Sequence, residues 1–152
     1  MSWVLVTGAG QRLGRAVATE MANAGWNVVI HYRAPNDEAE ALAAQLRDEA
    51  GVAAATVQAD LDDPAQRGSL IARADEAGGP LSALVNCAAM FEHDTVADLS
   101  EELLQRHIAL NAYTPALLAR DFAKALRGDD RGCVVNFLDF KLASPYPDHF
   151  SY

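Results

Sequence analysis

The sequence predicts an α/β protein built on a doubly wound parallel sheet of at least five strands. Short apolar runs rich in β-branched residues alternate with longer segments whose apolar residues recur at helical spacing. The strand-like runs are apolar almost throughout, as expected when helices cover both faces of a parallel sheet. Right-handed crossovers then bring successive strands side by side. We expect one domain, 1–152, because an apolar share of 51% is enough for a core.

The first half of the chain predicts three strands, each followed by a helix. The expected strands are 3–7, 27–32 and 54–60, and the expected helices are 13–25, 36–51 and 64–77. Leu13, Val17 and Met21 give the first helix its periodicity, and Gly25 is its expected stop. Asn36 is the expected N-cap of the second helix.

The second half predicts two more strands, 81–89 and 132–138, with helical patterns over 100–110 and 112–126 between them. The tail from Asp139 to Tyr152 is expected to be loop, because Pro145 and Pro147 interrupt it and little periodicity remains.

Charge and composition exclude several classes of protein. A net charge of −9 argues against a nucleic-acid partner, because phosphate backbones are bound by clustered cations. The chain has no apolar run of about 18 residues, so no membrane-spanning helix is expected. Its two cysteines form no disulfide framework and its four histidines have no metal-ligand spacing. We therefore expect a soluble cytoplasmic protein without a metal site.

The stretch TGAGQRLG, residues 7–14, follows the first strand and opens the first helix. Gly8 permits a tight turn, Gly14 permits close helix packing, and a helix N-terminus attracts an anion. The pattern predicts a phosphate cradle for a nucleotide. Arg12 stands where a third small residue is usual, and its guanidinium can fork onto a phosphate and face the substrate. The alternative for Arg12 is a solvent-exposed side chain at the helix start.

The end of the second strand indicates which nicotinamide cofactor is preferred. It reads Ile30-His31-Tyr32-Arg33, with no acidic residue before Asp37 to hold a ribose 2′-hydroxyl. A cation there attracts a 2′-phosphate, and one charge-assisted hydrogen bond of roughly 1.5–3 kcal/mol gives about one to two decades of preference. NADPH is therefore the expected cofactor. The alternative for His31 is a strand-end histidine that touches no ligand.

TGAGQRLG resembles the T-G-x-x-x-G-x-G pattern of short-chain dehydrogenases/reductases, and Arg12 in place of a glycine resembles their pteridine reductase branch. The His-Tyr pair at 31–32 resembles the same branch. The resemblance implies a Rossmann-like NADP-binding domain and, through LVNCAAMF at 84–91, a match to the family's N-N-A-G segment. It implies cofactor contacts by Leu13, Asp60, Leu61, Asn86 and Ala88. Asp60 is equally compatible with a simple turn.

The resemblance also extends to the substrate side of the site. Phe91 aligns with an aromatic residue that stacks a pterin ring against nicotinamide, although a core phenylalanine is the alternative. NAYTP at 111–115 resembles the N-x-x-x-P helix motif, which makes Asn111 the candidate active-site asparagine that holds a water. The alternative for Asn111 is a mid-helix residue without a role.

Asp139 stands where most short-chain reductases have serine, and it precedes Tyr152 by thirteen residues, as in pteridine reductases. The resemblance implies hydride delivery from NADPH to a C=N carbon, with Tyr152 donating a proton and Asp139 relaying it or orienting the donor. The implied substrate is a dihydropterin or dihydrofolate. A generic short-chain carbonyl reductase is the first alternative, and a non-catalytic nucleotide-binding module is the second.

The family motif Y-x-x-x-K begins at Tyr152, and its lysine has no counterpart within the 152 residues. We therefore expect the chain to be a fragment that lacks the C-terminal part of the family fold, about two strands and a long helix. The resemblance also implies a possible homo-oligomer, since tetramers are common in the family.

Overall fold

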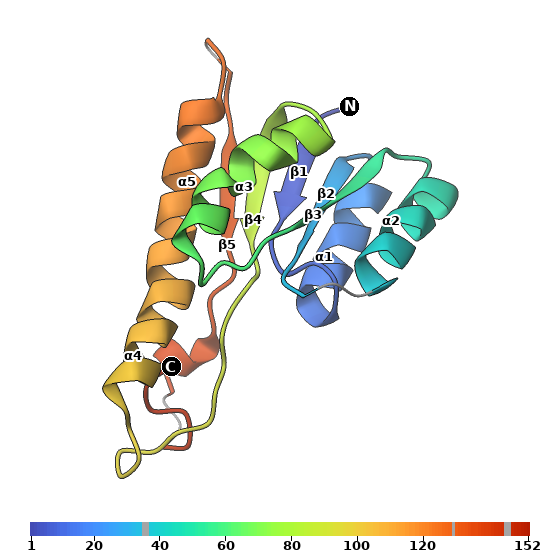
Figure 1. Cartoon of the computed structure of the whole chain (residues 1–152). Coiled ribbons are helices and arrows are strands. Elements are labelled where there is room, and N and C mark those ends of the chain that lie inside the picture. Colours follow the sequence, from blue (N-terminus) through green and yellow to red (C-terminus); the bar gives the residue numbers. More distant parts are fainter. Residues whose placement is uncertain (35–36, 129, 145–146) are drawn as a thin grey trace.

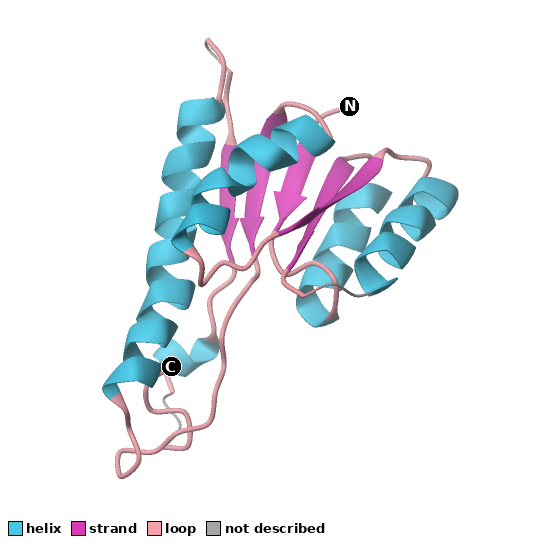
Figure 2. Ribbon diagram, in the orientation of Figure 1, coloured by secondary structure: helices cyan, strands magenta, loops and turns pink. Residues whose placement is uncertain are grey.

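The structure, a computed structural model, describes residues 1–34, 37–128, 130–144 and 147–152. It contains a parallel sheet of five strands in the order β3-β2-β1-β4-β5, with helices on both faces (Figures 1 and 2). The chain builds outward from β1 to β3 and then returns to the other side of β1 with β4. The predicted doubly wound parallel sheet is confirmed.

Every strand and helix predicted between residues 3 and 138 is present, with bounds that agree within three residues. The strands are β1 Trp3–Val6, β2 Asn27–Tyr32, β3 Ala54–Gln58, β4 Leu81–Asn86 and β5 Cys133–Asn136. The helices are α1 Arg12–Asn23, α2 Asp37–Ala50, α3 Pro64–Ala77, α4 Glu101–Ile108 and α5 Thr114–Ala125, with a π-helical segment Ala109–Tyr113 between the last two. The expected N-cap Asn36 lies outside the described residues.

The tail differs from the expected loop in two places. A 3₁₀ turn spans Phe140–Leu142, with the Asp139 carboxylate accepting from the Lys141 N–H at its start. Further on, His149 forms a parallel bridge with Asp94. Both features bring the tail back to the body of the protein.

Two apolar clusters cover the sheet, with α1 and α2 on one face and α3 and α5 on the other (Figure 1). Small residues line the most deeply buried face of α1. Its buried residues are Gly14, Ala18 and Ala22, whereas Leu13 is 53% exposed. These small side chains allow α1 to lie close to the strands, while Val17 and Met21 pack, partly buried, against the same cluster.

The two sides of the sheet differ in how well they are covered. Val4, Leu5 and Val6 of β1 are fully buried, whereas all four residues of β5 are exposed. In the described part of the chain, β5 pairs with β4 alone and forms an edge of the sheet. No helix among the described residues has the length and apolar character needed to cross a membrane.

Gly14→Ala is expected to lower the free energy of unfolding by about 1–3 kcal/mol, because overpacking displaces backbone. A Cβ at Gly14 would lie 2.2 Å from the Gly8 carbonyl oxygen, while one at Gly68 of α3 would meet nothing within 4 Å. Gly68→Ala is the matched control and is expected to raise stability by up to about 1 kcal/mol, since alanine favours helix. Urea denaturation of both variants checks the prediction, and equal effects would contradict it.

Candidate functional site

The candidate site lies at the carboxyl ends of the strands, where the chain leaves β1 and β4 next to each other (Figure 2). Thr7 joins these two exits. Its N–H donates to the Val85 carbonyl at 2.9 Å, and its Oγ1 accepts from the N–H groups of Cys87 and Ala88, each at 3.0 Å. A reversal of strand order of this kind leaves a crevice in which α/β proteins bind ligands.

The turn after β1 has no room for side chains at Gly8 and Gly14. Gly8 has a φ of 66°, and a Cβ there would lie 3.0 Å from the Ala88 Cα atom. Gly14 is packed against the Gly8 carbonyl, so the turn and the first turn of α1 are in direct backbone contact. Such a narrow turn at a helix N-terminus has the form of the predicted phosphate cradle.

Arg12 is strained. Its φ is 51°, and among the described residues it is the one non-glycine residue with a positive φ. The left-handed region costs an L-residue about 1–2 kcal/mol, which explains why glycine is usual at this position of the motif. The Arg12 side chain is exposed, as is that of Leu13. A strained arginine at the mouth of the turn suggests that its side chain has a role there.

His31 is buried to 1% exposure, and both of its ring nitrogens have partners. Nδ1 accepts from the Gly8 N–H at 3.0 Å, so Nε2 carries the proton and donates to the Ala59 carbonyl at 3.0 Å. Burial lowers the pKa of His31 to about 4, so the ring is neutral at pH 7. His31 therefore joins the glycine turn to the end of β3 and has no ring nitrogen left for the predicted contact with a cofactor phosphate.

The other residues predicted for the adenosine end have differing environments. Arg33 is exposed beyond β2, and its carbonyl accepts from Gln58 Nε2 at 2.6 Å. Asp60 forms a turn, since its Oδ1 accepts from the Asp62 N–H at 3.0 Å. Leu61 is buried in the core cluster that includes α3, while Tyr32 packs against the opposite cluster. Arg33 is thus the exposed cation at this end of β2.

At the other end of the site, Tyr152 lies beside Asp139. The phenol donates to Asp139 Oδ2 at 3.2 Å, although thirteen residues separate the two in the chain. Burial first, and then the charge and the hydrogen bond of Asp139, raise the pKa of Tyr152 above its ordinary value. The phenol is therefore protonated at neutral pH.

Phe91 is an exposed aromatic residue, not a core one. Its ring is 47% exposed and stacks on His149 with centroids 3.9 Å apart, while Lys141 Nζ lies 4.2 Å from the ring centroid. The Tyr152 ring meets Phe91 edge-on at 4.7 Å. The predicted partners Phe91, Asp139 and Tyr152 are therefore brought together.

The two predicted asparagines form hydrogen bonds, Asn111 to backbone and Asn86 to another side chain. Asn111, in the π-helical segment, accepts from the Met90 N–H and donates to the Met90 carbonyl, each at 2.8 Å. Asn86 donates to Asn136 Oδ1 at 2.8 Å, across the last paired residues of β4 and β5. Asn111 fixes the segment that leads to Phe91, while the Asn86–Asn136 bond joins two strand ends.

Two features of the site were not predicted from the sequence. Thr7 is the first residue of the glycine motif, but no local sequence pattern indicates its hydrogen bonds to the segment that follows β4. Asp94, His107 and Ser151 form a buried group, and Ser151 directly precedes Tyr152 in the chain. Only the adjacency of Ser151 to Tyr152 could have drawn attention to it.

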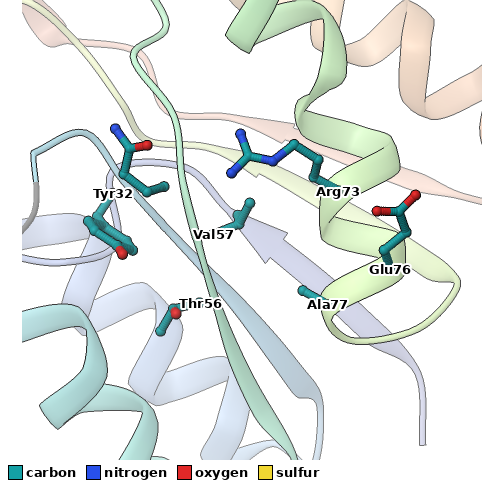
Figure 3. Close-up of a pocket in the computed structure, with 7 residues that line it drawn as sticks. Tyr32, Thr56, Val57, Arg73, Glu76 and Ala77 are labelled. Atoms are coloured by element: carbon teal, nitrogen blue, oxygen red, sulfur yellow. The ribbon is translucent and has the colours of Figure 1, made fainter.

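A surface groove of about 450 Å³ lies elsewhere, beside the edge strand β3 (Figure 3). Arg73 and Glu76 of α3 face it from one side, and Tyr32 lies at its other end. None of its lining residues belongs to the glycine turn or to the Phe91, Asp139 and Tyr152 group. Among the predicted site residues the groove is lined by Tyr32 alone, at the adenosine end.

Comparisons with known proteins agree on one family. A family model described as short chain dehydrogenase matches residues 2–147. A short-chain type dehydrogenase/reductase from Picea abies is 32% identical over 97% of this chain and 57% of its own length. NADPH-dependent aldehyde reductase 2, chloroplastic, from Arabidopsis thaliana is 33% identical over 86% of this chain and 53% of its own.

Solved structures agree with this family. FolM alternative dihydrofolate reductase 1 from Brucella suis, in complex with NADP, is 40% identical with a TM-score of 0.91, covering 99% of this chain and 62% of that one. A short-chain dehydrogenase from Sphingobium yanoikuyae in complex with NADPH is 30% identical, with a TM-score of 0.85, over 99% and 59%. The chain spans little more than half the length of these relatives.

The burial of neutral His31 predicts acid sensitivity. Its pKa of about 4 lies below the ordinary histidine value of 6.5, so its contribution to stability is complete above pH 6.5 and is lost as the pH falls from 6.5 through 4. The lost stability is up to about 3 kcal/mol. Unfolding free energies at pH 7 and pH 4 are expected to differ less in His31→Gln than in the wild type. His93→Gln, at an exposed position, should keep the wild-type difference. An unchanged difference in His31→Gln would refute the assignment.

Proposed function

Since this chain belongs to the short-chain dehydrogenase/reductase family, we propose that the protein containing it is an NADPH-dependent reductase of a pterin-like C=N bond. The observation that carries the proposal is the contact of the Tyr152 phenol with Asp139 beside the exposed Phe91 ring. Most members of the family are expected to have serine where this chain has Asp139. The FolM structure from Brucella suis, named a dihydrofolate reductase, supports the same substrate class.

The residues at the glycine turn fit a dinucleotide. Gly8 and Gly14 leave a backbone cradle that a Cβ would fill, and Arg12 and Arg33 are exposed cations on the same edge of the sheet. NADP-bound and NADPH-bound relatives support NADPH over NADH. Bound NADPH supplies the hydride, and Arg12 and Arg33 are the residues proposed to hold its phosphates.

The proton comes from Tyr152 in this proposal. Its raised pKa keeps the phenol protonated at pH 7, so it has a proton to donate to the substrate nitrogen. Hydride addition at carbon and proton addition at nitrogen convert the C=N bond into a C–N single bond with an N–H. Asp139 orients the phenol through its hydrogen bond. The phenolate left beside Asp139 requires a cation, which the family's Y-x-x-x-K lysine is proposed to supply from residues that follow Tyr152.

Phe91 is proposed as the wall on which a flat substrate stacks. Its ring is in contact with His149 and Lys141, so a bound heterocycle must take the place of one of them. The stack on His149, with ring centroids 3.9 Å apart and planes 11° from parallel, supports a surface that accepts a flat ring. A pterin is flat and heteroaromatic, whereas an aliphatic ketone would gain less from this wall.

We also propose that residues 1–152 form the cofactor-binding part of a longer domain. All four residues of β5 are exposed, unlike the buried strands at the centre of the sheet. Further chain that pairs with β5 would cover it and extend the sheet.

Arg12→Gly is expected to raise the free energy of unfolding by about 0.5–1 kcal/mol, because glycine relieves the positive φ but adds chain entropy. The same change should weaken NADPH binding by about 10- to 100-fold through the lost guanidinium. Arg15→Gly, in the interior of α1, is the matched control. It should lower stability by about 1 kcal/mol and leave NADPH binding unchanged. Denaturant titration and cofactor fluorescence measure both effects; unchanged NADPH affinity in Arg12→Gly would count against the role of Arg12.

The proposed function is tested by NADPH oxidation in the full-length protein with dihydrobiopterin, dihydrofolate, a quinone and a keto ester. The pterin substrates are expected to give the highest kcat/KM. Tyr152→Phe should lower kcat by at least about 100-fold, since general acid catalysis is lost. Tyr113→Phe is the control, because Tyr113 is 62% exposed and outside the site.

Two outcomes would overturn the proposal. A keto ester reduced faster than both pterins would indicate a generic carbonyl reductase. NADPH binding without turnover of any substrate would indicate a nucleotide-binding module without catalysis.

A further inference from the structure

We infer that Asp94, His107 and Ser151 form a buried clamp that positions Tyr152 against Asp139. This inference deepens the proposed function and rests on it for the role of Tyr152 as proton donor. The three clamp residues come from the loop after β4, from α4 and from the tail. They are 2%, 2% and 8% exposed, respectively.

Asp94 holds the tail through its backbone and its side chain. Its carboxylate oxygens accept from the Ser151 N–H at 3.1 and 3.2 Å. Its own N–H donates to the Asp148 carbonyl, and its carbonyl accepts from the Phe150 N–H, both at 3.2 Å. Burial opposes ionisation, but the hydrogen bonds from Ser151 hold the pKa of Asp94 below its usual value. A charged, buried carboxylate therefore fixes residues 148–151.

His107 connects the same tail to α4. Its Nε2 accepts from the Glu92 N–H at 3.2 Å, so the proton of the neutral ring is on Nδ1. Nδ1 then donates to Ser151 Oγ at 2.6 Å. Burial lowers the pKa of His107, which keeps the ring neutral and this tautomer in place. Ser151 is thereby held from two directions, by its N–H and by its hydroxyl.

The same three residue types form hydrolase triads, but the contacts here exclude that chemistry. In a triad the histidine lies between serine and aspartate and takes the serine proton. In this clamp Ser151 lies between His107 and Asp94, and the ring donates to the serine. Nε2 is also occupied by a backbone N–H. The arrangement has no base for a nucleophile and serves to hold the tail.

Tyr152 follows Ser151 directly in the chain. The clamp on Ser151 therefore fixes the backbone from which the Tyr152 side chain extends. The phenol donates a hydrogen bond to Asp139 at 3.2 Å, and this bond joins two segments that share no helix or strand. The Tyr152 ring also lies 6.1 Å from the His107 ring, in an edge-on arrangement. Positioning of a proton donor is sensitive to small displacements, and about 1 Å of misplacement can reduce the rate by about 100-fold.

The test is Ser151→Ala in the full-length protein, which removes the bond to His107 and keeps the N–H that Asp94 accepts. We expect kcat to fall by at least about tenfold, with the KM for substrate and the Kd for NADPH within about twofold of the wild type. Ser151→Thr retains a hydroxyl and should recover most of kcat. His107→Gln is the second variant, in case Ser151→Ala does not fold, and should have the same effect on kcat.

A readout without turnover separates this inference from the proposed function. The ¹³Cζ resonance of Tyr152, assigned by its loss in Tyr152→Phe, reports the phenol pKa. In Ser151→Ala or His107→Gln that pKa should fall toward its ordinary value, because a displaced phenol loses both the burial and the Asp139 contact that raise it. Asp94→Asn should do the same, whereas Asp98→Asn, on the same loop, should not. An unchanged Tyr152 resonance in all three clamp variants would overturn the clamp even if the enzyme reduces pterins. A shifted resonance in an enzyme that reduces no pterin would retain the clamp and reject the proposed substrate.

Discussion

The position of β1 between β2 and β4 in a parallel sheet is the constraint on which the site depends. It directs the exits of all three strands to one edge and requires their backbone groups to be satisfied there. Thr7 makes this connection toward β4, and His31 makes it toward the glycine turn and the end of β3. These buried crosslinks leave a glycine turn whose geometry is set before any ligand arrives, which is the condition for binding a phosphate without reorganisation.

The site combines unfavourable features that a purely structural element would not need. Arg12 occupies a left-handed conformation, His31 is buried without charge, and Asp94 is buried with charge. Each is held by the surrounding structure; Arg12 and His31 lie where strands end, and Asp94 lies in the loop that follows β4. Backbone strain and buried ionisable groups tend to gather at functional sites, so their coincidence here agrees with a site built for a ligand and a proton transfer.

The strands and most helices were predictable because their signals are local: β-branched runs, helical spacing and glycine stops. Contacts between residues far apart in the chain were harder to predict. The 13-residue spacing from Asp139 to Tyr152 pointed to their contact only through family resemblance. The sequence left open whether His31 contacts the cofactor or touches no ligand. Its hydrogen bonds to the Gly8 N–H and the Ala59 carbonyl, which occupy both ring nitrogens, could not be predicted. The clamp joins residues 57 positions apart, from Asp94 to Ser151, with no periodicity to reveal it. The spacing of Leu13, Val17 and Met21 predicted the helix α1, but it did not indicate that Gly14, Ala18 and Ala22 are its buried residues.

The central claim is that the phenol of Tyr152 and the carboxylate of Asp139 converge on the reacting end of a bound nicotinamide. The most direct measurement is a crystal structure of the full-length protein with NADP⁺ and a pterin. We expect Tyr152 Oη within hydrogen-bonding distance of both Asp139 and a ring nitrogen of the pterin, with that ring between Phe91 and the nicotinamide. A structure in which Tyr152 and Asp139 point away from the nicotinamide, or in which the pterin lies at another edge of the sheet, would contradict it.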